Sequence, residues 1–211
     1  MTEADRAVEA AVRAGLAAER PADGFLGEES GGVEGADGRR WILDPIDGTR
    51  NYLRGIPVWA TLLALEVDGA VALGVVSAPA LHRRWWAERG SGAWANGDPL
   101  HVSGVRRVEE AVVSFTRSAE DLPGARELAR RSWHARGFGD FWGHMLVAEG
   151  AADANLDAPG VTIWDLAAVQ VVVEEAGGRF TDLAGERRLD GGSALSSNGH
   201  LHDAVLALLR A

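Results

Sequence analysis

The residues best suited to chemistry are acidic and stand at the ends of apolar, strand-like runs. Asp44 and Asp47 flank a proline in the stretch WILDPIDGTRNY. Glu28 and Glu29 follow the short run GFLG, and Asp165 opens a helix-like run far downstream. Carboxylates that lie close together repel one another unless a cation is placed between them. Oxygen ligands of this kind suit Mg²⁺, Mn²⁺ or Ca²⁺ rather than zinc or copper.

The residues between and after the two aspartates point to the same chemistry. Pro45 stiffens the expected turn, so that both carboxylates and the Ile46 carbonyl could face one point. The amides of Gly48 and Thr49 would begin a short helix, where free N–H groups attract phosphate. Two alternatives stay open: a surface turn with solvated acids, and a Thr49 that serves simply as a helix N-cap. A metal cluster beside an amide cradle is the arrangement expected for phosphoryl transfer to water.

The composition excludes several other functions. The formal net charge is −10, so no basic stripe is present to bind nucleic acid. The sequence has no cysteine, which excludes disulfides and zinc–thiolate sites and fits a reducing cytoplasm. The N-terminal stretch mixes acids among its apolar positions, unlike a signal peptide, and no apolar run reaches the roughly 20 residues that span a membrane. We therefore expect a cytoplasmic protein that acts on a small molecule.

The elements that must position these residues change in character along the chain. Residues 1–105 predict a helix over 3–19 followed by a mostly antiparallel sheet, with a loop over 31–38, a strand from Arg39 to Leu43 and a hairpin at Asp68-Gly69. Residues 106–211 predict alternating strands and helices, with helices over 124–135, 140–150, 164–178 and from about 201. We expect two closely packed halves in one compact unit.

Three motifs together resemble one known family. GEES (27–30), WILDPIDGTRNY (41–52) and WDLAAVQVVVEEAGG (164–178) are similar, in order and spacing, to motifs of the metal-dependent inositol monophosphatase superfamily. The resemblance spans essentially the whole chain. It implies an α+β fold, a layered α/β/α/β/α sandwich, usually as a homodimer. It also implies hydrolysis of small phosphate monoesters with two or three Mg²⁺ ions per site, Mn²⁺ being a possible replacement.

Matching the motifs position by position assigns roles to individual residues. The resemblance implies that the metal ligands are Glu28, Asp44, the Ile46 carbonyl, Asp47 and Asp165. It implies that phosphate binds at Gly48 and Thr49, and that Glu29 is an acid beside the ligands. TEAD (2–5) matches a motif whose last residue, Asp5, helps Thr49 to orient and deprotonate the attacking water. Without the resemblance, Asp5 would be interpreted as an ordinary acid in the first turn of a surface helix.

Two further acids indicate the substrate through the family resemblance. GFGDFWGHMLVAEGAADANLD looks most like the histidinol-phosphate phosphatase branch of the family, with Asp140 and Asp157 at acidic substrate-facing positions. Histidinol phosphate carries an ammonium and an imidazole group, which acids would attract; Arg50 could approach the mouth of the site. The alternatives are that Asp140 caps the following helix and that Asp157 is a solvated acid at a strand end. The histidines are expected to be scattered, with the HLH run (200–202) at the surface.

Three functional interpretations follow. The first is a Mg²⁺-dependent histidinol-phosphate phosphatase, and the second is a phosphatase of inositol 1-phosphate or another sugar phosphate. The third is a non-catalytic, metal-binding relative, which the intact set of Glu28, Asp44, Asp47, Thr49 and Asp165 disfavours. Relatives usually have a further N-terminal segment before the TEAD-like motif, so the resemblance implies either a start upstream of Met1 or a trimmed first layer.

Overall fold

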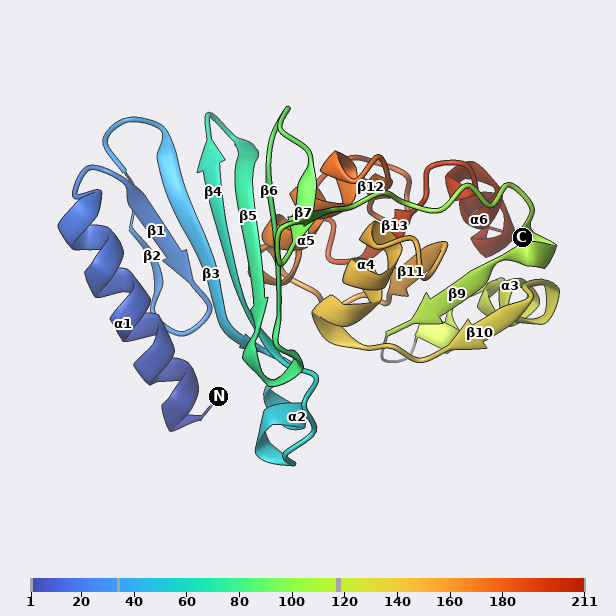
Figure 1. Ribbon diagram of the computed structural model, residues 1–211, viewed down its shortest axis with the longest axis horizontal. Helices are drawn as coiled ribbons and strands as arrows, with labels where there is room; N and C mark the ends of the chain where they lie inside the picture. The colour runs from blue at the N-terminus through green and yellow to red at the C-terminus, as the bar shows by residue number, and fades with distance from the viewer. Residues whose placement is uncertain (1, 34, 117–118, 211) are drawn as a thin grey trace.

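The computed structural model describes residues 2–33, 35–116 and 119–210 (Figure 1). Two sheets form the frame. The first has eight strands in the order β2-β1-β3-β4-β5-β6-β7-β8, and the second has five in the order β10-β9-β11-β13-β12. The strands of the first sheet are β1 (Gly24–Gly27), β2 (Gly31–Val33), β3 (Arg39–Asp47), β4 (Ala60–Val67), β5 (Ala70–Ala78), β6 (Arg83–Glu88), β7 (Ala93–Ala95) and β8 (Asp98–Pro99). Those of the second are β9 (Val112–Phe115), β10 (His134–Arg136), β11 (Ala154–Asp157), β12 (Arg179–Thr181) and β13 (Ala194–Ser197).

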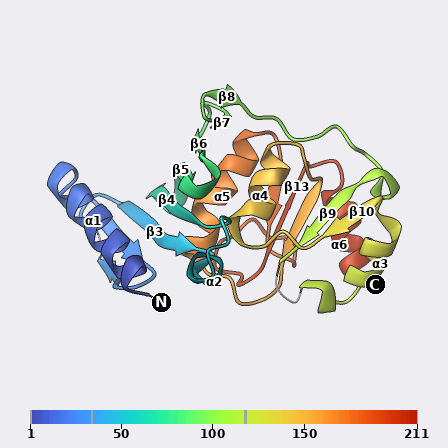
Figure 2. The same cartoon turned by 60° about the horizontal axis from the view of Figure 1, so that its bottom comes forward.

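Helices complete five layers around the two sheets (Figures 1 and 2). One helix covers the outer face of the first sheet, two lie between the sheets, and two cover the far face of the second sheet. In that order they are α1 (Glu3–Glu19), then α4 (Asp140–Ala148) with α5 (Ile163–Glu175), then α3 (Ala125–Arg131) with α6 (His202–Leu209). The short α2 (Thr49–Leu53) follows β3 directly. The expected layered α/β/α/β/α sandwich is therefore confirmed.

Burial explains why the central helix reads as continuously apolar. All eight residues from Leu166 to Val173 in α5 are buried, because this helix packs against both sheets. The helix α1 has the opposite character: the two residues that it buries are acids, Asp5 and Glu9. An isolated buried carboxylate is costly, so both must meet hydrogen-bond donors or a cation inside the fold.

The two halves of the chain share one interior. The first sheet ends at Pro99 and the second begins at Val112, on either side of the boundary expected at residues 105 and 106. Helices α4 and α5 belong to the second half, yet their apolar side chains join those of β3 to β7 in a single core cluster. The division of the chain into two halves stays a prediction.

Several local expectations need correction. The strand expected to stop at Leu43 continues to Asp47, and the loop expected over residues 31–38 contains β2, which pairs with β1. The helix expected over 124–135 ends at Arg131, after which β10 pairs in parallel with β9. The hairpin at Asp68-Gly69 is confirmed, with both residues at positive φ (51° and 77°), as a tight two-residue turn requires. No helix in the described parts of the chain is long and apolar enough to cross a membrane.

Candidate metal and phosphate site

A bulge in β3 brings Asp44 and Asp47 to the same side of the sheet. In a regular strand, residues three apart point to opposite faces. Here Asp44 pairs with Leu62 and Asp47 with Ala60, so three steps along β3 oppose two along β4. Because of the extra residue in β3, the side chains of Asp44 and Asp47 point to the same face of the sheet. The Thr61 hydroxyl donates a 2.9 Å hydrogen bond to the Pro45 carbonyl inside the bulge, and proline suits this place because it has no N–H to pair.

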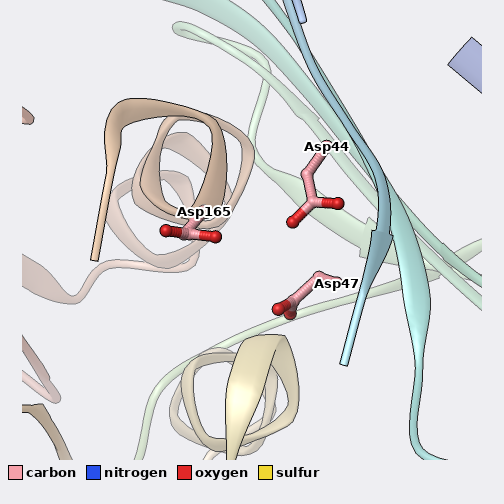
Figure 3. Close-up of side chains that lie close together, drawn as sticks. All are labelled: Asp44, Asp47 and Asp165. Atoms are coloured by element: carbon pink, nitrogen blue, oxygen red, sulfur yellow. The ribbon is translucent and has the colours of Figure 1, made fainter. Parts of the chain in front are cut away.

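Asp165 approaches the two aspartates from the N-terminus of α5 (Figure 3). It belongs to a capping box in which its Oδ2 accepts hydrogen bonds from the Thr162 amide (2.6 Å) and hydroxyl (2.8 Å). These bonds fix the carboxylate on the first turn of the helix. One oxygen from each of Asp44, Asp47 and Asp165 lies within 4.8 Å of the other two. Asp165 thus shares one small space with Asp44 and Asp47, although it lies 118 positions after Asp47 in the chain.

Glu28 reaches the same cavity from the turn after β1. Its amide donates a 3.2 Å hydrogen bond to the Leu43 carbonyl, which ties the turn to β3. Its side chain lies outside the group of three aspartates but lines the same cavity, together with Ile46. Burial, followed by the charge of Asp165, raises the pKa of Glu28.

The electrostatics of this group require a positive partner. Burial raises the pKa of Asp44 and of Asp47 well above the usual value, and Asp47 and Asp140 respectively add to the effect by repulsion. Burial also raises the pKa of Asp165. The sequence contains no lysine, and Arg50 is the one arginine among the described residues that line the cavity.

A buried oxygen shows that these residues fit a metal ion. Among the described residues, Asp44 Oδ1 has no hydrogen-bond partner, although it is shielded from water. An unpaired buried carboxylate oxygen is strongly unfavourable unless a proton or a cation meets it. Several carboxylate oxygens and a carbonyl are the ligands that hard divalent cations prefer. The group of Asp44, Asp47 and Asp165 can therefore hold a metal ion.

Gly48 shapes the side of the cavity where phosphate is expected to bind. It has φ +81°, a left-handed conformation that favours glycine, and a Cβ placed there would lie 2.9 Å from the Val58 carbonyl oxygen. Gly48, not Thr49, is the N-cap of α2, so the simple N-cap interpretation of Thr49 is wrong. The first backbone amides of a helix have no hydrogen-bond partner within the helix. In α2 these are the amides of Gly48 and Thr49, the two residues expected to bind phosphate.

The Thr49 hydroxyl lies between two acceptors. Its oxygen is 2.9 Å from the Ile46 carbonyl and 3.4 Å from Asp5 Oδ1. Asp5 is 0% exposed and accepts a hydrogen bond from the Thr2 amide, so it is not a solvated acid of a surface helix. Glu29 lies nearby: burial and then the charge of Asp5 raise its pKa, and its Oε2 is buried without a partner among the described residues. The structure therefore brings Asp5 to Thr49, with Glu29 close enough to Asp5 for the Asp5 charge to raise its pKa.

The two acids expected to face the substrate, Asp140 and Asp157, line the same cavity, whose volume is about 590 Å³. Asp140 is the first residue of α4, with φ 57°, and its Oδ2 accepts a 3.0 Å hydrogen bond from Asn51 Nδ2. The N-cap of α4 is Gly139, and the first-turn amide of Phe141 donates to Asp47 Oδ2, so Asp140 is not the cap of this helix. Asp157 is 3% exposed, which contradicts the interpretation as a solvated acid. Its charge also raises the pKa of Asp47 and of Asp165. Arg50 is exposed and lines the cavity.

Sequence reasoning missed four polar residues that line this cavity. They are Asn51, which bonds Asp140, Thr116 and His144, which both bond Asp157, and Thr162, which bonds Asp165. The spacing of His144 from Asp140, four residues apart on one helix, is a signal that could have found it, because such residues share a helix face. The surface expectation for the HLH run is half wrong: His200 is exposed, but His202 is fully buried between Thr181 and Ser197.

Comparisons with known proteins agree on one group. A family model described as the inositol monophosphatase family matches residues 1–211. A histidinol-phosphatase of Mycobacterium tuberculosis is 52% identical over 100% of this chain and 85% of its own length. An inositol-1-monophosphatase of Mesorhizobium japonicum is 34% identical over 100% of this chain and 82% of its own. The solved structure of extragenic suppressor protein suhB from Bartonella henselae superposes with a TM-score of 0.93 at 35% identity, covering 99% of this chain and 88% of that one.

Proposed function

Because the chain belongs to the inositol monophosphatase family and hydrolyses phosphate monoesters, we propose that its substrate is L-histidinol phosphate and that its metal is Mg²⁺. The reaction converts L-histidinol phosphate and water into L-histidinol and inorganic phosphate. The observation that carries this proposal is that two further acids, Asp140 and Asp157, line the same cavity as the aspartate cluster. The histidinol-phosphatase of Mycobacterium tuberculosis, at 52% identity, supports it.

The metal side of the proposal assigns ligands to this chain. Asp44, Asp47, Asp165, Glu28 and the Ile46 carbonyl would hold two or three Mg²⁺ ions, or Mn²⁺ in their place. When bound, such ions would lower the pKa of water and would stabilise the negative charge that develops on the phosphate and on the leaving oxygen. The pKa values raised by burial and repulsion agree with a site that is electrostatically incomplete without cations.

The residues around Thr49 would orient the water. Its hydroxyl has one proton and two acceptors within reach, the Ile46 carbonyl and Asp5 Oδ1. Donation to Asp5 leaves the lone pairs of Thr49 Oγ1 available to accept a proton from the attacking water. Asp5, with Glu29 beside it, then serves as the base through Thr49. The amides of Gly48 and Thr49 would bind the phosphate oxygens at the N-terminus of α2.

The other side of the cavity would select the alcohol part of the substrate. The ammonium and imidazole groups of histidinol are attracted by Asp140 and Asp157, whereas the neutral ring of inositol gains less from these charges. Arg50 is exposed and lines the cavity, and it would contact the substrate as it enters. The family also includes inositol monophosphatases, so inositol 1-phosphate or another sugar phosphate is the second candidate. Retention of the whole acidic set disfavours a non-catalytic metal-binding role.

Two further proposals concern the oligomeric state of the enzyme and its cellular compartment. The family resemblance favours a homodimer, and the absence of cysteine fits a reducing compartment, for which we propose the cytoplasm. Light scattering from the purified protein would give the mass of the assembly.

Phosphate release tests the substrate. It is measured on histidinol phosphate, inositol 1-phosphate and fructose 1,6-bisphosphate, each with Mg²⁺ and with a chelator. We expect the largest kcat/KM on histidinol phosphate and no turnover in the chelator. A preference for inositol 1-phosphate would overturn the substrate, and turnover in the chelator would overturn the metal.

A further inference from the structure

His144 lines the cavity but has no part in the reaction described above, and its ring makes a short, buried contact with Asp157. His144 Nε2 lies 2.6 Å from Asp157 Oδ2, and His144 Nδ1 lies 2.9 Å from Ser196 Oγ. The His144 side chain is 2% exposed and that of Asp157 is 5% exposed, so bulk water does not screen the contact. The Thr116 hydroxyl hydrogen-bonds the other oxygen, Asp157 Oδ1. Both oxygens of Asp157 are therefore held.

The 2.6 Å contact with Asp157, much shorter than the 3.4 Å contact of Nε2 with Asn155 Nδ2, sets how His144 is protonated. A carboxylate can only accept, so Nε2 must carry a proton and donate it to Asp157. In the neutral ring, Nδ1 then accepts from the Ser196 hydroxyl, which can rotate to donate. One chain of contacts runs from Ser196 through His144 to Asp157. Hydrogen bonds to a charged acceptor are stronger than neutral ones and set the direction of the acceptor more firmly.

The constellation contains a serine, a histidine and an aspartate but cannot act as a nucleophilic triad. Ser196 is 0% exposed and does not line the cavity, whereas His144 and Asp157 do. The group presented to a substrate is thus the carboxylate end of the chain, not the hydroxyl end. In a nucleophilic triad the hydroxyl faces the substrate and the carboxylate is hidden.

We propose that His144 is a positioning residue that holds the Asp157 carboxylate in place as a binding wall for a cationic group of the substrate. The proposal rests on the proposed function, since it concerns the alcohol side of that same cavity. Asp157 is the last residue of β11, and its side chain could otherwise rotate. Held at both oxygens, it keeps one orientation and loses little freedom when a cation binds. His144 acts through Asp157 and is not placed in contact with the reacting phosphate.

A pair of substrates separates this role from a general structural one. KM and kcat are measured for histidinol phosphate, which carries cationic groups, and for inositol 1-phosphate, whose alcohol is neutral. We expect His144→Phe to raise KM for histidinol phosphate by about tenfold or more, with kcat changed by less than about threefold. KM for inositol 1-phosphate should stay within about twofold of the wild-type value. His144→Gln, which keeps an N–H donor near the ε position, should restore most of the affinity for histidinol phosphate.

The controls decide between the outcomes. His202→Phe removes another buried histidine that bonds two hydroxyls and does not line the cavity, so it should leave both KM values unchanged. If His144→Phe does not fold, Ser196→Ala removes the hydroxyl that holds Nδ1 and should shift KM in the same direction by a smaller factor. Equal losses on both substrates, or no loss on histidinol phosphate, would overturn the role of His144. A wild-type enzyme that hydrolyses inositol 1-phosphate but not histidinol phosphate would instead overturn the proposed function.

Discussion

Glu9 of α1 accepts a hydrogen bond of 2.9 Å from the backbone amide of Glu29. Its second oxygen accepts one of 2.8 Å from the amide of Ser30. The carboxylate lies against Gly27, where an added Cβ would come within 2.4 Å of Glu9 Oε2. Glu9 is 3% exposed, and through these bonds α1 fixes the turn that positions Glu28.

We predict that Glu9→Gln weakens cation binding. A glutamine offers one acceptor oxygen, so one of the two amides loses its partner, at a cost of about 1–3 kcal/mol in the free energy of unfolding. A looser turn should hold Glu28 less firmly, so more Mg²⁺ should be needed for half of the maximal rise in melting temperature. Glu19→Gln, at the exposed end of the same helix, is the control. An unchanged Mg²⁺ requirement in Glu9→Gln would show that the turn does not depend on Glu9.

Gly48→Ala should inactivate the enzyme by distorting the turn between β3 and α2. Alanine at φ +81° costs about 1 kcal/mol in strain, and its Cβ would lie 2.9 Å from the Val58 carbonyl oxygen. The matched control is Gly55→Ala, at φ +71°, where no atom lies within 4 Å of an added Cβ. We expect similar strain in both variants but a fall in kcat/KM of tenfold or more for Gly48→Ala alone. Equal kcat/KM values would remove Gly48 from the phosphate site.

Removing one carboxylate should stabilise the metal-free protein. The pKa of Asp44 lies well above 3.8 in the folded state, mainly because of burial and then because of Asp47. Between these two pKa values the folded protein binds more protons than the unfolded chain, so stability falls as pH rises through that window. In chelator and above the raised pKa, we expect Asp44→Asn to need more denaturant for unfolding than the wild type. The advantage should disappear near pH 3 and should reverse when Mg²⁺ is added; exposed Asp98→Asn should show neither effect.

The parts of this site that could be predicted from the sequence are those set by local motifs, whereas the parts set by contacts between distant segments could not be predicted. The motifs around Glu28, Asp44 and Asp165 are local patterns, and the structure brings all three residues to one cavity. The bulge in β3 was not anticipated, because it depends on the register of β3 against β4. The sequence suggested a turn at Pro45, whereas pairing with β4 keeps this segment in the strand.

Contacts between distant segments were also beyond the reach of the sequence. His144 and Asp157 lie on different elements, and only the packing of α4 on β11 joins them. The helix expected over 124–135 runs into β10 because Ala, Leu, Glu and Arg after Pro123 favour helix locally, whereas pairing with β9 decides the outcome. The five-layer fold was nevertheless predictable through the family resemblance, which covers the entire chain.

The buried His202 should make the protein sensitive to acid. Its Nε2–H donates to Thr181 Oγ1, whose own proton is given to the Asp182 carbonyl, and its Nδ1 faces the Ser197 hydroxyl. Burial lowers the pKa of His202 to about 4, so the unfolded chain binds the extra proton first as pH falls from 6.5. Stability should therefore decrease between pH 6.5 and pH 4, by up to about 3 kcal/mol.

Denaturant unfolding of His202→Gln measures this contribution. The variant should lose that part of the acid dependence, while His200→Gln, at the exposed neighbouring position, should keep it. If the free energy of unfolding of His202→Gln falls with decreasing pH as steeply as that of the wild type, the acid sensitivity belongs to other groups.

The most direct test of the account is Asp47→Asn, with cation binding and phosphate release measured on the same preparation. Asp47 is one of the three aspartates whose oxygens lie within 4.8 Å of one another, and its Oδ2 also accepts a 2.5 Å hydrogen bond from the Phe141 amide. Asparagine can still accept that bond, so the fold should persist in unfolding measurements. We predict weakened Mg²⁺ binding by calorimetry and no measurable phosphate release. A folded Asp47→Asn enzyme with a near-normal rate would contradict the assignment of this cluster as the catalytic metal site.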